Sequence, residues 1–472
     1  MGSRGSQYDR LLAGSVCLSL GVRWPTHSTS RYPQVCTIFR RWLRYALWMT
    51  IAFLLCGIAY RLVRRMDRPP TIVTVLFVAV LFGLPLISTY PINANDLFRY
   101  MIRGRVSSVY GANPFATPPN AFPEDPFLSL AGEWVSETSP YGPIWEIAAG
   151  AITKLSREGL YLNLIMFKGF GLFTHLAVAF MIWRLLDDLA DSERIARTLL
   201  WAWNPALLLT FVVDAHNDGL MLLWFLLGIW LARRDQHILG FILMFMAPLT
   251  KPIALLPMPF FFLMFWRAMP SSKAKTRFVL LSAVGLALMV WVAFLPFGSP
   301  IYLVERLLRE ASGGGGFSLQ ALFILMAQHY QYRLPMRQLN QTALIGFGLA
   351  ALWLFWTAWR GRHPFRGAAD IFYVYVLQAM SFRIWYTVWS FPWLILDTDE
   401  GESTDSRLLF GMSLLLTSQL SVIIYGHLRV YYFQDEFLKP HLIGVPFTFG
   451  VPLLLAAGWR FYRIRKLTPA SR

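Results

Sequence analysis

Charged side chains follow one long apolar run of the chain at spacings that favour a shared helix face. Residues 93–115 read NANDLFRYMIRGRVSSVYGANPF. If residues 95–108 form a helix, Asp96, Arg99 and Arg103 lie on one face, and most of the apolar residues gather on the other. A carboxylate one and two turns from arginines can take a proton from a hydroxyl while the arginines bind a phosphate. Glycosyl transfer from a lipid phosphate is one reaction that needs both of these jobs.

The same spacing also has a purely structural interpretation. Asn93 can cap the helix, which places Asp96 in the first turn, where exposed amide groups favour a negative charge. Arg99 is then only its salt-bridge partner. In either case we expect the helix to lie flat at the membrane interface. Spacing alone leaves both interpretations open.

A second polar cluster lies between two apolar runs, in VVDAHNDG at 212–219. Ionisable groups near a membrane are costly unless they face a cavity, so His216, Asn217 and Asp218 are candidate substrate-binding groups. Asp214 and His216 alone make an incomplete metal-ligand set, and no metal site is expected. Capping of a helix that begins at Gly219 is the structural alternative.

Lys251 and Arg383 are two further candidate phosphate-binding cations. Lys251, in PLTKP, interrupts an apolar stretch, although it can also snorkel from an ordinary helix end. Arg383 precedes Trp385 and Tyr386 in FRIWYTVW, which offers a cation with aromatic walls. Tyr141, in SPYGPIW, can add to an apolar floor for a sugar, or anchor the chain at the interface.

The composition indicates a polytopic membrane protein. The 472 residues are 56% hydrophobic and 15% charged, which is more apolar than a soluble core requires. The net charge of +17 is spread over short loops, so it reads as an orientation signal and gives no support for nucleic-acid binding. The three cysteines have no metal-like spacing and form no disulfide framework. No cofactor is predicted.

The apolar runs predict a single all-α integral membrane domain over 1–472, with about 12–14 transmembrane helices. The runs lie near 43–60, 71–89, 160–183, 197–213, 217–232, 237–249, 251–266, 278–296, 342–359, 368–382, 385–396, 407–424 and 441–461. Residues 143–155 are expected to form a re-entrant or interfacial helix, and 11–22 a short additional membrane helix.

Most of the arginines and lysines fall on one side if these spans alternate, and that side is predicted to be cytoplasmic. The opposite side then holds an outer loop with interfacial helices at 90–159, a second outer loop at 297–341, and the polar clusters described above. The expected location is the cell membrane, with the active site on the extracytoplasmic face. The SGGGG stretch at 312–316 is either a hinge or an ordinary solvent loop.

The ordered motifs DLFRYMIRGRVSSVYGANPF, PYGPIW, HNDGLM and WYTVW, each at an expected outer membrane edge, resemble those of one family. This family is the polyprenyl-phosphate-mannose-dependent α-(1→6)-mannosyltransferases of the GT-C superfamily, which build lipomannan-type cores in bacteria. The resemblance spans roughly residues 70–395. It implies a GT-C-like bundle whose first large outer loop carries the catalytic acid, which matches Asp96.

The resemblance further implies a polyprenyl-phosphate sugar donor, a glycan or glycolipid acceptor, inversion at the anomeric carbon and no metal requirement. Two departures leave the sugar and the acceptor open: Phe98 stands where the family commonly has tyrosine, and FRIWYTVW stands where QPWYLLW is typical. The alternative function is a transporter or flippase of a lipid-linked sugar. Transporters favour ionisable residues near mid-membrane and repeated halves, whereas these charges cluster at one face.

Overall fold

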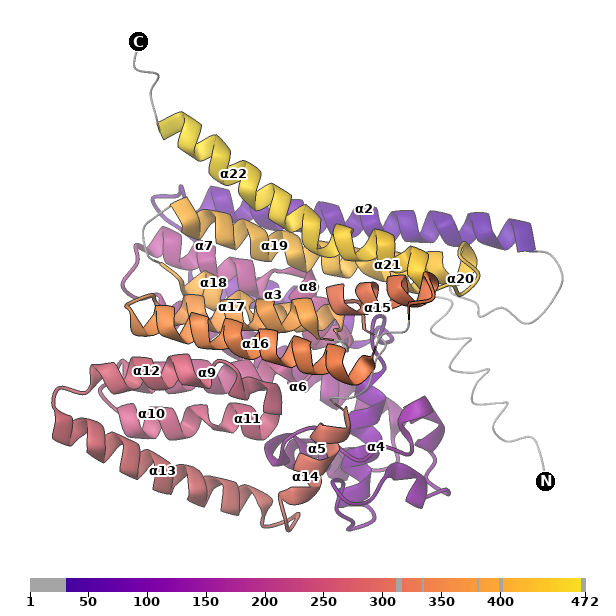
Figure 1. The fold of residues 1–472 in the computed structure, drawn as a ribbon, viewed down its shortest axis with the longest axis horizontal. Coiled ribbons are helices and arrows are strands. Elements are labelled where there is room, and N and C mark those ends of the chain that lie inside the picture. Colours follow the sequence, from indigo (N-terminus) through magenta and orange to yellow (C-terminus); the bar gives the residue numbers. More distant parts are fainter. Residues whose placement is uncertain (1–30, 311–315, 333–334, 380–381, 399–401, 468–472) are drawn as a thin grey trace.

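The chain is a bundle of helices in the computed structural model (Figure 1). The structure describes residues 31–310, 316–332, 335–379, 382–398 and 402–467. Within these ranges every regular element is a helix, and each apolar run named above overlaps one. The all-α polytopic fold predicted from the sequence is confirmed.

The helices fall into three groups along the chain. The first group runs up to the loop before residue 160: α2 (Arg31–Val63), α3 (Ile72–Ile87), α4 (Asp96–Ser108), η1 (Pro119–Ala121), η2 (Leu128–Trp134) and α5 (Pro143–Ser156). The second comprises α6 (Leu160–Leu185), α7 (Asp191–Ala202), α8 (Pro205–Leu208), η3 (Leu209–Val213), α9 (Asp218–Ala232), α10 (His237–Met244), α11 (Met246–Thr250), η4 (Pro252–Leu255), α12 (Met258–Ala268) and α13 (Ser272–Phe294). The third comprises α14 (Ile301–Glu310), α15 (Leu319–His329), α16 (Met336–Trp359), α17 (Pro364–Gln378), η5 (Ile384–Trp389), α18 (Phe391–Leu396), α19 (Glu402–Val422), η6 (Ile423–Leu428), α20 (Arg429–Tyr431), α21 (Leu438–Val445), η7 (Pro446–Gly450) and α22 (Val451–Leu467).

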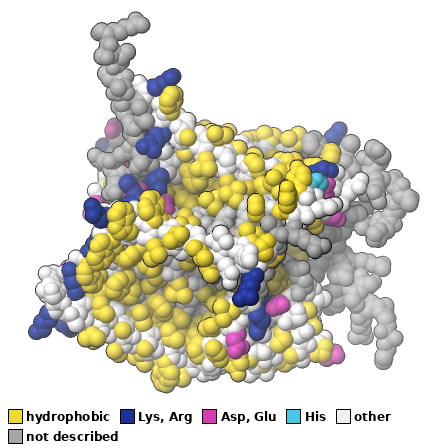
Figure 2. Space-filling model, viewed as in Figure 1, with side chains coloured by type: hydrophobic (Ala, Val, Ile, Leu, Met, Phe, Trp, Pro, Cys, Tyr) yellow, Lys and Arg dark blue, Asp and Glu magenta, His cyan; other side chains and the backbone are white. Residues whose placement is uncertain are grey.

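Six segments of the described chain are long and apolar enough to cross a membrane: Arg40–Val63, Leu160–Leu185, Ser272–Phe294, Met336–Trp359, Asp405–Tyr431 and Leu438–Arg463. A seventh is possible if Asp191–Ala202 and Pro205–Val213, bent by 43° at their junction, form one span. Five of six shorter apolar helices overlap further predicted runs, and the run at 368–382 overlaps α17. Hydrophobic side chains cover the middle of the surface in Figure 2, and Lys and Arg gather along its left edge. This banding is expected of a membrane protein.

Helix α4 packs against α5 so closely that the contact requires a glycine. A Cβ on Gly104 would lie 2.7 Å from the carbonyl oxygen of Ala149, which is closer than carbon and oxygen can approach without a shift. The helix predicted over 95–108 is present as α4, and α5 and η2 pack over it. Two of its arginines are almost fully buried: Arg103 is 2% exposed and Arg105 is 1% exposed. Protein surrounds most of this helix, and its expected position flat at the membrane interface stays a prediction.

The expected side-chain caps of α4 and α9 are not formed, although Asp96 does lie in the first turn of α4 and pairs with Arg99. Asn95 stands at the cap of α4 and makes no side-chain capping bond, while the Asn93 amide donates to Gln419 Oε1 at 2.9 Å. Helix α9 begins at Asp218 and not at Gly219, and Asn217 at its cap likewise makes no side-chain capping bond. The polar side chains of both segments thus have partners elsewhere in the fold.

A π-helical turn, η3, leads into the polar turn at 214–217. Gly171 of α6 lets the two backbones touch, since a Cβ there would lie 1.9 Å from the carbonyl oxygen of Phe211. Ala215 then adopts a left-handed conformation, with φ of 54°, which is unfavourable for a residue with a side chain. Such irregular turns recur at functional sites.

The two predicted outer regions contain further helices. Range 90–159 holds α4, η1, η2 and α5, and range 297–341 holds α14, α15 and the start of α16. The expected helix at 11–22 and residues 312–315 of the glycine stretch lie outside the described residues.

Candidate active site

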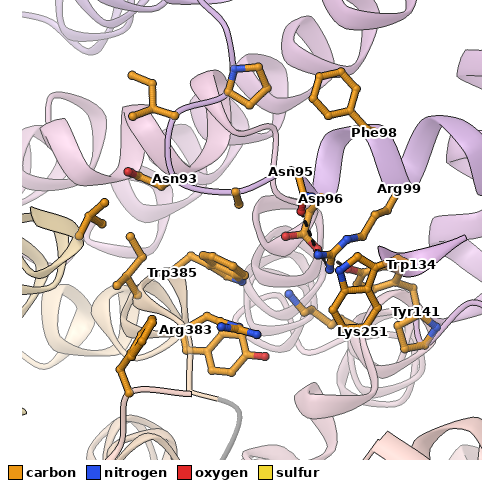
Figure 3. A pocket seen from close by; sticks show the side chains of 18 of the residues that line it. Asn93, Asn95, Asp96, Phe98, Arg99, Trp134, Tyr141, Lys251, Arg383 and Trp385 are labelled. Carbon is orange, nitrogen blue, oxygen red and sulfur yellow. Dashed lines mark hydrogen bonds and ion pairs between the residues drawn. The ribbon is translucent and has the colours of Figure 1, made fainter. Parts of the chain in front are cut away.

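A cavity of about 810 Å3 opens among segments that are far apart in the sequence (Figure 3). Its walls come from the loop before α4, from α4 itself, from the start of η4, from η5, and from η6 with α20. Eight of the predicted site residues line it: Asp96, Arg99, Arg103, Tyr141, Lys251, Arg383, Trp385 and Tyr386. Most of the residues predicted for the site therefore line one cavity, and their roles there stay predictions.

Asp96 is the first residue of α4, and its side chain is only 6% exposed. Its Oδ1 accepts hydrogen bonds from the Tyr141 hydroxyl at 3.1 Å and from Arg99 Nη1 at 3.3 Å. Burial alone would raise the pKa of Asp96, but the charge of Arg99, other nearby cations and the Tyr141 bond together lower it below the ordinary value. The carboxylate is thus ionised at neutral pH and lies on the cavity wall.

Arg99 is held against Asp96 by several contacts. Its Nη2 donates to Asn95 Oδ1 at 2.9 Å, and its guanidinium lies 3.9 Å from the centre of the Trp134 ring. Figure 3 shows Arg99 between Asp96 and Trp134. That Arg99 binds phosphate stays a prediction. Its observed contact is the ion pair with the Asp96 carboxylate.

Arg103 also has a local partner, the loop that carries Tyr141. Its Nη2 donates to the carbonyl of Glu137 at 3.3 Å, and Arg306 of α14 donates to the next carbonyl, that of Thr138, at 3.2 Å. The Ser139 hydroxyl donates to Glu146 Oε1 at 2.5 Å. Two buried arginines and a carboxylate therefore fix the path of the chain toward Tyr141.

Lys251 forms a buried ion pair at the cavity wall. Helix α11 ends there, and the Lys251 Nζ lies 2.6 Å from Oδ1 of Asp218, whose side chain is fully buried. The Trp389 indole N–H donates to the same oxygen. Three aromatic rings surround the ammonium, with centres 5.4–6.0 Å away: Tyr141, Tyr386 and Trp389. Asp218 thus holds the lysine, and the lysine faces the cavity.

The other two residues of the polar turn lie behind the cavity wall. His216 stacks on Trp385 at 4.4 Å between ring centres, and burial lowers its pKa to about 4, so the ring is neutral at physiological pH. Asn217 Oδ1 accepts from the Tyr100 hydroxyl at 3.4 Å. Neither residue, nor Asp218, is among those that line the cavity. Their predicted contact with substrate stays a prediction. His216 and Asp218 contact residues that line the cavity, whereas the partner of Asn217, Tyr100, does not line it.

Arg383 and Trp385 face the cavity from the wall opposite Asp96 (Figure 3). They and Tyr386 belong to the short helix η5 and the residue before it, in the FRIWYTVW segment, and they line the same cavity as Asp96. Sugars stack on aromatic faces, and arginine binds phosphate in two-pronged geometry. This wall therefore adds both kinds of contact.

Three buried polar groups, absent from the predicted site, hold the segment that leads into Asp96. Lys168 of α6 donates to the carbonyl of Thr89. Asp214 Oδ1 accepts from the backbone N–H groups of Ile92 at 2.8 Å and Asn93 at 3.2 Å. Gln419 of α19 accepts from the Asn93 side chain. A lysine inside an apolar helix is a signal that sequence reasoning should have used; Gln419 carries no such signal.

The comparisons with known proteins agree with this geometry. A family model described as the N-terminal domain of α-(1→6)-mannopyranosyltransferase matches residues 12–268, which is more than half of the chain. The chain belongs to the α-(1→6)-mannopyranosyltransferase family. The matched range includes Asp96, the polar turn at 214–218 and Lys251, whereas the wall formed by η5, η6 and α20 lies beyond it.

Curated members of the α-(1→6)-mannopyranosyltransferase family are distant in sequence. α-(1→6)-Mannopyranosyltransferase A of Mycobacterium tuberculosis is 23% identical over 312 residues, which is 62% of this chain and 58% of that protein. The A enzyme of Corynebacterium glutamicum is 24% identical over 38% of this chain and 36% of its own length. The B enzyme of the same organism is 26% identical over 32% and 25%. The chain thus spans less than two thirds of each of these relatives.

Proposed function

We propose that this protein is a membrane mannosyltransferase that moves mannose from a polyprenyl-phosphate donor to a glycan or glycolipid acceptor, with Asp96 as the general base. Family membership supports mannosyl transfer, since the curated relatives are named for it. The observation that carries the proposal is the ionised carboxylate of Asp96 on the wall of a cavity that also presents Lys251, Arg383 and aromatic rings.

The reaction is a single displacement. An acceptor hydroxyl oxygen attacks the anomeric carbon of the sugar, its proton passes to Asp96, and the bond from that carbon to the phosphate oxygen breaks with its electron pair leaving on the phosphate. Attack opposite the leaving group inverts the anomeric configuration. Asp96 therefore needs to lie on the acceptor side, and cations on the phosphate side stabilise the charge that develops there.

The contacts of each cation suggest how these roles divide. Arg99 is bonded to Asp96 itself, so it orients the base and keeps it ionised. Lys251 and Arg383 lie on other parts of the wall (Figure 3) and are the better candidates for the leaving phosphate. The rings of Trp385 and Tyr386 would hold the sugar between them and the base.

The active site is proposed to face the extracytoplasmic side of the cell membrane. The helix ends rich in arginine and lysine lie at the other end of the bundle from α4 (Figures 1 and 2), and such ends favour the cytoplasm. A donor presented on the outer leaflet would then reach the cavity directly.

The test compares the purified full-length chain with its Asp96→Asn variant, using polyprenyl-phosphate-mannose and a short mannoside acceptor. We expect kcat to fall by roughly 10³-fold, because a general base contributes about 10²–10⁴-fold. Glu124→Gln, which changes an exposed acid of the same outer region that does not line the cavity, should retain wild-type activity. An active Asp96→Asn enzyme removes the base assignment. Movement of the lipid-linked sugar without any glycoside product would instead indicate a transporter.

A further inference from the structure

The cavity has a second cationic end that the proposed reaction does not use. Arg429, the first residue of α20, lines the same cavity as Asp96. Helices α20 and α4 lie well apart across one end of the bundle (Figure 1). The residues beside Arg429 on the cavity wall are Val422, Tyr425 and Gly426. This end comes wholly from the C-terminal part of the chain, beyond the range that the family model matches.

Arg429 has little to satisfy its charge within the protein. Its ion pair with Asp435 spans 4.0 Å, and the Asp435 side chain is 68% exposed, so water weakens the pair further. The guanidinium lies 4.7 Å from the centre of the Phe437 ring. Its Nε–H is buried and has no hydrogen-bond partner among the described residues. A buried donor left unpaired is costly, so an acceptor from outside the chain, either water or a ligand, would stabilise this site.

Apolar surface surrounds this cation both inside and outside the cavity. On the wall, Phe317 stacks on Tyr425 with ring centres 3.8 Å apart. Outside it, side chains of the same stretch are exposed and hydrophobic: Val430, Tyr432, Phe437, Leu442 and Ile443. In a membrane protein such surface faces lipid. One arginine at the border of a cavity and a lipid-facing surface matches an anionic headgroup joined to hydrocarbon chains.

The distance between Asp96 and Arg429, at the two ends of the cavity, indicates which lipid Arg429 binds. Gln419 contacts Asn93, three residues before Asp96, and Arg429 lies ten residues further along the same helical segment, about 15 Å at 1.5 Å per residue. A monophosphate donor carries one phosphate, which must lie within one sugar ring of the reacting centre beside Asp96. The distant cation is therefore left for another anion.

We infer that Arg429 binds the phosphodiester headgroup of the acceptor's lipid anchor and thereby presents the acceptor glycan to Asp96. This inference rests on the proposed function. Arginine suits the role because its fork of N–H groups matches two phosphate oxygens. The apolar surface of α20 and α21 carries the acyl chains, and the headgroup enters where the cavity meets that surface.

Binding is tested first without any reaction. The full-length chain in detergent is titrated with dioctanoyl phosphatidylinositol and with dioctanoyl phosphatidylcholine, which has the same chains but no net charge, and thermal stabilisation is recorded. We expect Arg429→Gln to weaken phosphatidylinositol binding about tenfold, Arg429→Lys to weaken it less, and phosphatidylcholine binding to stay unchanged. Lys439→Gln removes an exposed cation of the neighbouring helix that does not line the cavity, and should behave as wild type. Equal phosphatidylinositol binding by wild type and Arg429→Gln overturns the inference.

Kinetics then separate the two lipid substrates. For Arg429→Gln we expect the KM of a phosphatidylinositol-anchored mannoside to rise about tenfold, while the KM of a neutral alkyl mannoside and that of the donor stay constant. A rise in the KM of the donor alone would show that Arg429 binds the donor phosphate, and would overturn the assignment to the acceptor. Inactivity of the wild-type chain with every acceptor would count against the proposed function, while the binding titration still decides whether Arg429 holds the headgroup.

Discussion

The two ends of the helix bundle use their charged residues in different ways. At the end away from α4, arginines are paired with carboxylates and carbonyls of other helices. Arg366 Nε lies 2.8 Å from Asp397 Oδ2, and Arg407 Nη2 lies 2.7 Å from Asp370 Oδ1. Arg197 donates to the carbonyls of Ile395 at 2.8 Å and Asp397 at 3.1 Å. These bonds join α7, α17, α18 and α19.

At the cavity end, cations instead line a space large enough for a ligand. Lys251 shares its carboxylate partner with Trp389, and the carboxylate that pairs with Arg429 among the described residues is distant and exposed. Charges at the first end hold helices together. At the cavity end Arg103 and Arg306 hold a loop, whereas Lys251 and Arg429 line the space proposed for substrate. The difference means that removal of a charge should alter stability at the first end and activity at the second.

The largest expected effect is on activity, from Lys251→Gln. If Lys251 stabilises the leaving phosphate, kcat should fall by about 10²–10³-fold, as for other groups that stabilise developing charge. The change also leaves the buried Asp218 carboxylate without its cation, which destabilises the fold. Steady-state kinetics on folded protein, isolated by size exclusion, measure the first effect.

A double variant separates these two consequences. Lys251→Gln combined with Asp218→Asn removes both charges, so thermal stability should recover toward wild type while activity stays low. Recovery of activity in the double variant would show that Lys251 matters only for structure, and would erase the contrast between the two ends.

A smaller effect, this time on stability, is expected from Asp397→Asn at the other end. Asp397 is 2% exposed, and its loss leaves Arg366 and Arg407 without a full counter-charge. We expect a destabilisation of about 2–3 kcal/mol, below the usual value for a broken buried pair because both arginines are partly exposed. Thermal unfolding measures it. Activity per folded molecule should not change, and a selective loss of kcat would contradict this.

The sequence predicted elements better than it predicted their surroundings. Apolar runs and turn residues located the helices, since both signals are local. The burial of α4 was missed because it depends on packing against α5, whose Ala149 is 45 positions from Gly104, and residue spacing within α4 does not encode that contact. The position of Asp218 behind Lys251 was missed for a similar reason: an ion pair between residues 33 positions apart becomes visible only after folding. Arg429 was missed because a single arginine near the end of a helix looks like an ordinary membrane anchor.

The smallest expected effect concerns a carboxyl group at the cavity end to which no cation of the described part of the chain is bonded. Glu146 is 1% exposed and bonded to Ser139, its Oε2 has no partner among the described residues, and burial raises its pKa to about 7. Between its ordinary pKa of 4.5 and about 7, the folded state keeps this proton and the unfolded state releases it. Stability therefore falls as pH rises through this window and levels off above it.

Glu146→Gln should remove part of that slope, since the amide oxygen still accepts from Ser139 but cannot ionise. Relative to wild type, we expect little change at pH 5 and a gain of roughly 1–2 kcal/mol at pH 8, measured by thermal unfolding at each pH. Asp214, whose pKa burial also raises to about 7, contributes a similar slope, so some pH dependence remains. If the dependence of stability on pH is unchanged in Glu146→Gln, Glu146 is already ionised in the folded protein. The charge of Arg103, which lowers the pKa of Glu146, would then offset burial, as the arginines do for the carboxylates at the opposite end of the bundle.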